Sequence, residues 1–183
     1  MTDIKNTLIT QQTLDWIRSF IIEFNICPFA KHVVDKGTLT IKVVNAIKLA
    51  DAMEELMLAV EALDKNPDIE TTLILFPTIL DDFFEYLNFT DVAEQLLFEQ
   101  GYEGIYQLAT FHPDYCFADV DPDDVSNYTN RSPYPMLHLL REESVAKAVA
   151  YHGNTEQIPE DNIATMHKLG LDKIKALLKR ICI

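Results

Sequence analysis

The sequence contains few of the residues and motifs that mark common cofactor sites. Its 183 residues include only five glycines, and neither the GxGxxG pattern nor a P-loop pattern occurs. This absence disfavours NAD-binding and P-loop nucleotide modules. The GxSxG and HExxH patterns of common hydrolases are also missing. The sequence therefore names neither a cofactor nor a reaction.

Cysteines are few and widely separated. Cys27, Cys116 and Cys182 form no CxxC pair, so neither a zinc knuckle nor a thioredoxin-type dithiol is indicated. Reduced thiols of this kind are typical of a cytosolic protein. The first residues also lack the basic region and apolar core of a signal peptide. We therefore expect a cytoplasmic protein.

Basic residues and long apolar runs are scarce as well. Fifteen Lys and Arg stand against 29 Asp and Glu, which gives a formal net charge of −14. Phosphate contacts need clustered cations, so we expect no nucleic-acid partner and no docking on anionic membranes. No run approaches the roughly 18 apolar residues of a membrane-spanning helix. What the chain does have is ordinary: hydrophobic residues make up 48%, which is typical of a single globular domain over 1–183.

The hydrophobic pattern predicts alternating helices and strands. Strands are expected at 38–44, 71–76 and 104–111. Helices are expected at 11–25, 46–65, 81–87, 90–100, from 132 onward, 160–168 and 171–181. This order predicts an α/β fold with a three-or-more-stranded, mainly parallel sheet, flanking helices and a C-terminal helical segment, with an α+β sandwich as the alternative. A further strand is expected within 28–36 or 115–120.

Two strand ends predict where a site lies. Pro77 follows the strand at 71–76, and His112 follows the strand at 104–111. If these strands are parallel, both residues mark the same edge of the sheet, where open α/β folds usually bind ligands. The segment after His112 is polar and irregular. Between Phe111 and Glu142 it holds two of the five histidines and four of the eight prolines.

An anion site is the first interpretation of this segment. Ser132 and Pro133 are favoured at the N-cap and first turn of a helix, and a helix N-terminus suits phosphate or carboxylate. Asn127, Asn130 and Arg131 lie just before it, and Arg131 could add a bidentate contact. The alternative is structural: Ser132 simply begins a helix, and Arg131 pairs with the nearby aspartates.

Acid–base chemistry is the second interpretation. His112 directly follows a strand, and histidine titrates near neutral pH. His138, Arg141 and Glu142 have i, i+3, i+4 spacing, which would place them on one face of the expected helix. Here His112 and His138 would transfer protons, Asp124 would orient one of them, and Arg141 would assist in holding the anion. A solvated helix face is the alternative.

Metal binding is a third interpretation. The acidic run of Asp119, Asp121 and Asp123 begins like a calcium loop, but Asp124 stands at the glycine position and Asn130 at the final glutamate position. Specific EF-hand binding is therefore not expected. A looser divalent-metal site of Asp119, Asp121 or Asp124 with His112 is an alternative.

Thiol redox or metal chemistry could instead use Cys27, His112 and Cys116. Cys27 follows the first expected helix, and a helix C-terminus does not lower the pKa of a thiol. This position favours a small buried side chain over a nucleophile.

Two blocks also carry a family resemblance. CPFAK at Cys27–Lys31, together with TFHPDY and TNRSPYPMLHLLRE, resembles an uncharacterised bacterial family, the domain-of-unknown-function group fourteen-fifteen. The resemblance extends from the first helix to the last and implies a small cytoplasmic bacterial protein, with no activity to transfer. It suggests that one site is marked by the blocks containing Cys27, His112, Asn130, Arg131, His138 and Arg141.

The leading hypothesis from sequence is an enzyme acting on a phosphate- or carboxylate-bearing metabolite by hydrolysis, transfer or elimination. Thiol redox or metal chemistry is the second hypothesis. A non-catalytic interaction module whose acidic surface meets a basic partner is the third. The sequence leaves the oligomeric state open.

Overall fold

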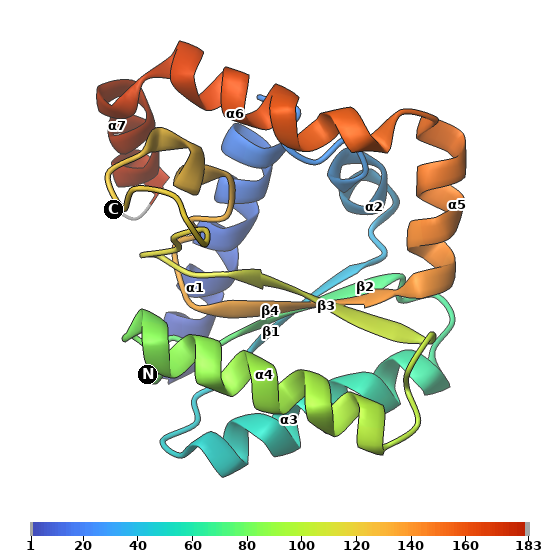
Figure 1. Ribbon diagram of the computed structural model, residues 1–183. Helices are drawn as coiled ribbons and strands as arrows, with labels where there is room; N and C mark the ends of the chain where they lie inside the picture. Colours follow the sequence, from blue (N-terminus) through green and yellow to red (C-terminus); the bar gives the residue numbers. More distant parts are fainter. Residues whose placement is uncertain (1, 182–183) are drawn as a thin grey trace.

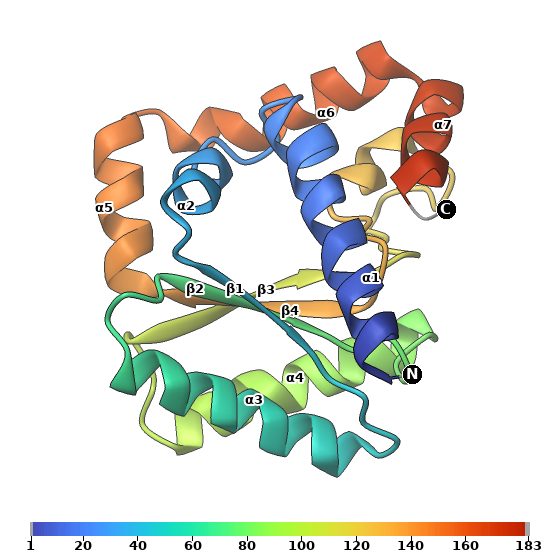
Figure 2. The ribbon, with the colours of Figure 1, turned by 180° about the vertical axis from the view of Figure 1, so that it is seen from behind.

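The computed structural model describes residues 2–181, so Cys182 lies outside the described residues. A four-stranded sheet is covered by helices on both faces (Figures 1 and 2). The strands are β1 (Leu39–Val43), β2 (Thr71–Leu75), β3 (Tyr106–Phe111) and β4 (Met136–Arg141). The helices are α1 (Thr2–Trp16), α2 (Ala30–Lys36), α3 (Leu49–Lys65), α4 (Phe83–Glu99), α5 (Glu142–His152), α6 (Ile158–Leu169) and α7 (Leu171–Ile181), with short segments η1 (Ile17–Ile22), η2 (Val125–Thr129) and η3 (Thr155–Gln157).

The sheet is mixed, with the strand order β1-β2-β4-β3. β1 and β2 pair in parallel, whereas β4 runs antiparallel to both β2 and β3. The expected mainly parallel sheet is therefore wrong, and the α+β alternative fits. The expected common edge is confirmed, because β2 and β3 are both antiparallel to β4 and so point the same way.

β4 is the element that the sequence pattern predicted wrongly. A helix was expected from Ser132, but Met136–Arg141 forms a strand, and α5 begins only at Glu142. Leu137 and Leu139 are fully buried on one face of this strand, and Met136 is fully buried on the other. A strand buried on both faces is a continuous apolar run, which periodicity alone does not distinguish from a buried helix. The extra strand thus lies at neither 28–36, which contains α2, nor 115–120.

The other expected elements are largely confirmed. The three predicted strands correspond to β1, β2 and β3, and the helix expected at 46–65 is α3. The two helical pieces expected at 81–100 are one continuous helix, α4, whose N-cap Asp82 accepts a hydrogen bond from the Glu85 amide. The first helix begins at Thr2, well before residue 11, and continues as the π-helical segment η1.

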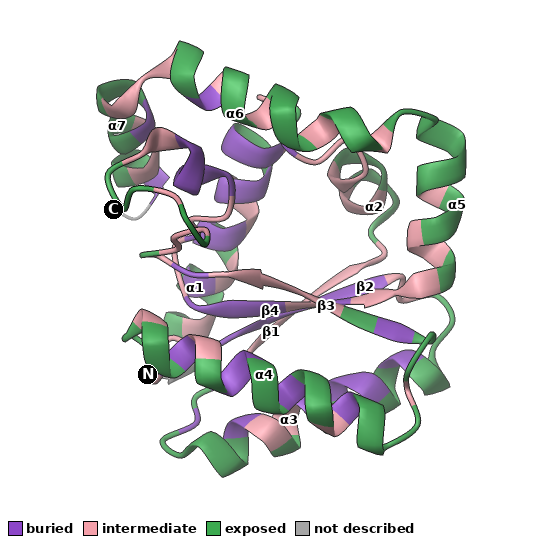
Figure 3. Cartoon of the chain, viewed as in Figure 1, coloured by how far each residue is buried: buried purple, intermediate pink, exposed green. Residues whose placement is uncertain are grey.

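Two apolar cores separate at the sheet. On the α3 face, α3 and α4 pack against Ile74, Leu137 and Leu139. On the α1 face, α1, η1, α6 and α7 pack against Leu73, Leu75 and Met136. Two further helices of the α1 face, α2 and α5, contain no fully buried residue, as the absence of purple on them in Figure 3 shows. The sheet is therefore less tightly covered under these two helices.

One buried tyrosine joins α4 to the edge where β3 ends. The Tyr86 hydroxyl donates to the Met136 carbonyl at 2.8 Å and accepts from the Phe111 amide at 3.0 Å. Burial raises its pKa far above the usual value for tyrosine. The hydroxyl therefore stays protonated, and it satisfies two backbone groups at the ends of neighbouring strands.

We predict that Tyr86→Phe lowers the free energy of unfolding by about 1–3 kcal/mol, because the substitution leaves buried backbone groups without a partner. Urea denaturation measures this effect. Tyr151→Phe is the matched control, since Tyr151 is 95% exposed. Equal stability of the two variants would contradict this role for the Tyr86 hydroxyl.

Candidate functional site

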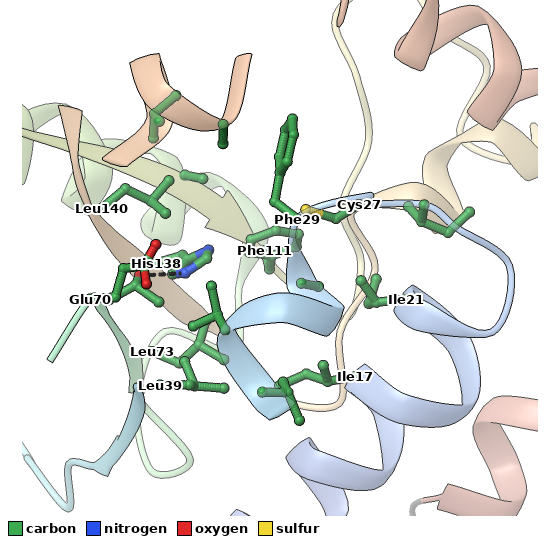
Figure 4. Close-up of a pocket in the computed structure, with 18 of the residues that line it drawn as sticks. Ile17, Ile21, Cys27, Phe29, Leu39, Glu70, Leu73, Phe111, His138 and Leu140 are labelled. Atoms are coloured by element: carbon green, nitrogen blue, oxygen red, sulfur yellow. Dashed lines mark hydrogen bonds between the residues drawn. The ribbon is translucent and has the colours of Figure 1, made fainter. Parts of the chain in front are cut away.

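A cavity of about 310 Å³ lies on the α1 face of the sheet, between α1 and η1 on one side and α2, α5 and α6 on the others. Its walls are mainly apolar and include Ile21, Phe29, Leu73, Phe111 and Leu140, which are labelled with His138 in Figure 4. Ligand pockets usually measure about 300–1,000 Å³. The cavity is therefore large enough for a small organic molecule.

The alternation of β4 explains why a histidine lines this cavity. Leu137 and Leu139 belong to the core of the α3 face, so His138 and Leu140 point to the other side, into the cavity. His138 pairs with Leu73 of β2 and with Ala109 of β3. Ala109 is small and also lines the cavity, which leaves space beside the imidazole ring.

Hydrogen bonds determine the tautomer of His138. The Thr71 hydroxyl donates to the Leu139 carbonyl at 2.7 Å, because a carbonyl oxygen can only accept. The same hydroxyl oxygen lies 2.7 Å from His138 Nε2, so the ring nitrogen must supply the proton of this second bond. Nδ1 therefore carries the lone pair. It has no hydrogen-bond partner within residues 2–181, and it points away from Thr71 toward the cavity (Figure 4).

The imidazole ring is neutral at physiological pH. Desolvation by burial lowers the pKa of His138 to about 4. Its side chain is half-buried, but the exposed part meets the cavity rather than the protein surface. What His138 can do chemically is accept a hydrogen bond, or a proton, from a molecule in the cavity.

Cys27 also lines the cavity, at the end of the chain segment that follows η1. Burial raises the pKa of its thiol, an effect that outweighs the opposing hydrogen bonds from the backbone of Phe29 and Ala30. Cys27 is therefore a neutral thiol and part of the apolar wall. This agrees with the small buried side chain expected from its position after a helix.

His112 lies elsewhere, on the α3 face. Its ring is fully buried among Phe83 and Tyr86. Nε2 donates to the Leu80 carbonyl at 2.9 Å, and Nδ1 accepts from the Asp114 amide at 3.0 Å. Both ring nitrogens are occupied, so the structure does not bring His112 together with His138 as a catalytic pair.

The expected helix start at Ser132 is absent, so the expected anion site lacks the helix N-terminus on which it was based. The Ser132 hydroxyl donates to the Tyr134 carbonyl at 2.7 Å. Arg131 donates to the carbonyls of Tyr115 and Pro122 at 3.0 and 2.9 Å, and its guanidinium lies 4.5 Å from the centre of the Tyr128 ring. Arg131 thus holds the polar loop together.

The remaining loop candidates are engaged in the same way. Asn127 is fully buried and donates to the Asp121 carbonyl while it accepts from the Phe117 amide. Asn130 lines the cavity, but its amide nitrogen donates to the Thr110 carbonyl.

Asp124 caps η2 and is hydrogen-bonded to neither His112 nor His138. Its carboxylate accepts from the Ser126 amide at 2.8 Å, and this hydrogen bond lowers its pKa. The histidine that it does approach is His167 of α6, at 3.7 Å.

Arg141 forms hydrogen bonds at the C-terminal end of α3. Its guanidinium donates to the carbonyls of Leu63, Asn66 and Ile69 and to the Tyr106 hydroxyl. The shared helix face expected for His138, Arg141 and Glu142 is wrong, because the first two lie on β4 and Glu142 begins α5. Arg141 nevertheless lines the cavity.

No metal site is evident in the part of the chain that the structure describes. Residues 2–181 contain no group of three or more His, Cys, Asp or Glu placed to hold a metal ion. Cys116 donates to the Val120 carbonyl at 3.5 Å, and neither it nor Cys27 forms a disulfide. The set Cys27, His112 and Cys116 is therefore not assembled.

Four sequence candidates meet at the cavity, namely Cys27, Asn130, His138 and Arg141. Sequence reasoning missed Glu70, Thr71 and the π-helical segment η1, which also contribute to the wall. A signal existed for η1, because it lies shortly before the CPFAK block in the sequence, and π-helical turns are often found at functional sites. Trp16 is a further wall residue, whose buried Nε1 has no partner among the described residues.

The family is shown by comparison with known proteins. Residues 8–176 match the family described as Protein of unknown function (DUF1415), and the chain therefore belongs to it. No curated protein and no solved structure matches the chain. Within residues 2–181, no helix has both the length and the apolar character needed to cross a membrane.

We predict that Arg131→Met lowers the free energy of unfolding by about 1–3 kcal/mol, because two carbonyls lose a charged donor. Arg18→Met is the control, since Arg18 is exposed on η1. Chemical denaturation of both variants tests the structural role. An unchanged stability together with loss of ligand binding would instead support the anion-binding role expected from sequence.

We also predict a pH effect from His138. Because its folded-state pKa lies below the usual value of about 6.5, the unfolded protein binds this proton more tightly. Stability is therefore complete above about pH 6.5 and falls as the pH approaches 4. The loss is up to about 3 kcal/mol, since one pKa unit corresponds to about 1.4 kcal/mol.

Urea denaturation of wild type and His138→Leu across this pH range isolates the effect of His138. The stability of the variant relative to wild type should increase as the pH falls. A difference that stays constant with pH would show that the imidazole is not held neutral.

Proposed function

We propose that the protein binds a small organic molecule in the cavity on the α1 face, with His138 as the residue that contacts the polar end of this ligand. One observation carries the proposal: His138 presents an unpaired Nδ1 lone pair to an otherwise mainly apolar cavity. Most polar atoms inside a folded protein have a hydrogen-bond partner, and a ligand donor in the cavity would supply one for this nitrogen.

The properties of the walls support the same proposal. Cavities with apolar walls, a few polar groups and residues of shifted pKa are the usual location of ligand sites. Here two residues of shifted pKa, His138 and Cys27, line the cavity. The two helices over the cavity, α2 and α5, have no fully buried residue, so they cover it less tightly than the other helices of this face.

An enzymatic role would use the same group. A neutral imidazole with Nε2–H held by Thr71 can take a proton at Nδ1 from a bound substrate. Thr71 would act as a positioning residue, because its hydroxyl selects the tautomer. Catalysis on an anionic metabolite stays a prediction, as do the thiol or metal hypothesis, the interaction module and the cytoplasmic location.

The geometry gives less support to an anionic ligand than the sequence did. Arg131 does not line the cavity, and it is engaged with two backbone carbonyls. Arg141 does line it, but donates to three carbonyls and a hydroxyl. An anion in the cavity would therefore meet few available donors.

A pair of alanines on α5 provides the test. Ala148 lines the cavity, whereas Ala150 is exposed and does not. We expect Ala148→Phe to fill the cavity and to abolish the thermal shift produced by any small molecule that stabilises the wild type. Ala150→Phe should keep that shift.

A screen of small apolar and polar molecules by thermal shift identifies such ligands, and methyl NMR of Ile21 and Leu73 shows whether they enter the cavity. Binding that is equal in the two variants would place the ligand elsewhere and refute the proposal.

A further inference from the structure

We propose that the ligand of this cavity is a mainly apolar molecule whose polar end is a hydrogen-bond donor, such as an alcohol, a phenol or an amine, and not an acceptor-only group such as a carboxylate or phosphate. This inference rests on the proposed function and specifies its ligand class. It follows from whether the polar groups on the cavity wall are hydrogen-bond donors or acceptors.

The wall groups with free capacity that a ligand can reach are mainly acceptors. The unpaired Nε1–H of Trp16 is a donor, but this atom is buried within the wall. His138 offers Nδ1, because Nε2–H is used by Thr71. Glu70 is a carboxylate and can only accept. Asn162 donates its amide nitrogen to the Ile26 carbonyl at 2.9 Å, which leaves its Oδ1 as an acceptor. Gln107 and Ser144 can donate or accept, so they do not change this balance.

The cation on the wall has little capacity left for an anion. The Arg141 guanidinium forms four hydrogen bonds, three of them to the carbonyl oxygens of Leu63, Asn66 and Ile69 at and just beyond the end of α3. Its fourth acceptor, the Tyr106 hydroxyl, donates in turn to the Asp64 carboxylate at 2.6 Å. The charge of Arg141 is therefore already compensated, and a carboxylate placed near Glu70 would be repelled.

The apolar walls determine the body of the ligand. Phe29, Phe111 and Leu140 surround the imidazole in Figure 4. Enclosed apolar cavities bind small hydrocarbons, because no polar group there holds water strongly. A ligand with one donor and an apolar body would satisfy Nδ1 and fill the rest of the cavity.

Four probes of similar size and different polar ends test this ligand class: p-cresol, 4-methylbenzylamine, 4-methylbenzoate and toluene. We would titrate each into the wild-type protein and follow the methyl signals of Ile21 and Leu140 by NMR. We expect p-cresol or 4-methylbenzylamine to bind about tenfold or more tightly than 4-methylbenzoate. The ¹⁵N signal of His138 Nδ1 should shift on binding of a donor probe.

His138→Leu separates the hydrogen bond from the apolar contacts. We expect the affinity of the donor probe relative to toluene to fall by about 2–10-fold in this variant, as expected for one neutral hydrogen bond. Thr71→Val, which keeps the imidazole but removes its tautomer-selecting partner, should lower the same ratio, and Thr71→Ser should restore it.

The outcomes distinguish this inference from the proposed function. Binding of 4-methylbenzoate as tightly as the donor probes, or a ratio unchanged by His138→Leu, overturns the ligand class. If Ala148→Phe still blocks that binding, the cavity remains the site. Failure of all four probes to bind the wild type contradicts both proposals.

Discussion

The central position of β4 is the constraint on which the rest of the structure depends. The strand pairs with β2 on one side and β3 on the other, so it joins two parts of the sheet that point the same way. Its alternation directs Leu137 and Leu139 into one core and His138 into the cavity. At its end, Arg141 donates hydrogen bonds to the carbonyls of Leu63 and Asn66 at the C-terminal end of α3. One strand thus completes the sheet, one helix end and the cavity wall.

A single threonine hydroxyl gives the cavity its polarity. Thr71 has one proton, and the Leu139 carbonyl requires it, so His138 must donate from Nε2 and present Nδ1 as an acceptor. Without this restriction the imidazole could expose either a donor or an acceptor to the cavity. The chemistry available to a ligand is therefore decided by a backbone carbonyl that the ligand would not touch.

The polar segment between β3 and β4 uses most of its candidate side chains to hold its own backbone, while Thr129 and Asn130 line the cavity. Asn127, Arg131 and His112 each use their polar atoms on backbone groups. A long irregular segment has no helix or ladder partners for its amides and carbonyls, so polar side chains replace them. The segment is rich in asparagine, histidine and arginine because of this requirement. The same composition is typical of a catalytic site, so the sequence alone does not distinguish the two.

The sequence by itself determined β1, β2, β3, α3 and the C-terminal helices, because local periodicity and turn residues specify such elements. It also determined the family, through its sequence blocks, and the common edge of β2 and β3. It also marked Cys27, Asn130, His138 and Arg141, which do line the cavity. Only the tertiary structure decided that Met136–Arg141 is a strand, since pairing on both sides outweighs helical spacing in a short apolar run. It also decided which histidine faces the cavity, because the face of the sheet to which a residue points depends on strand register, and register is set by partners distant in the sequence.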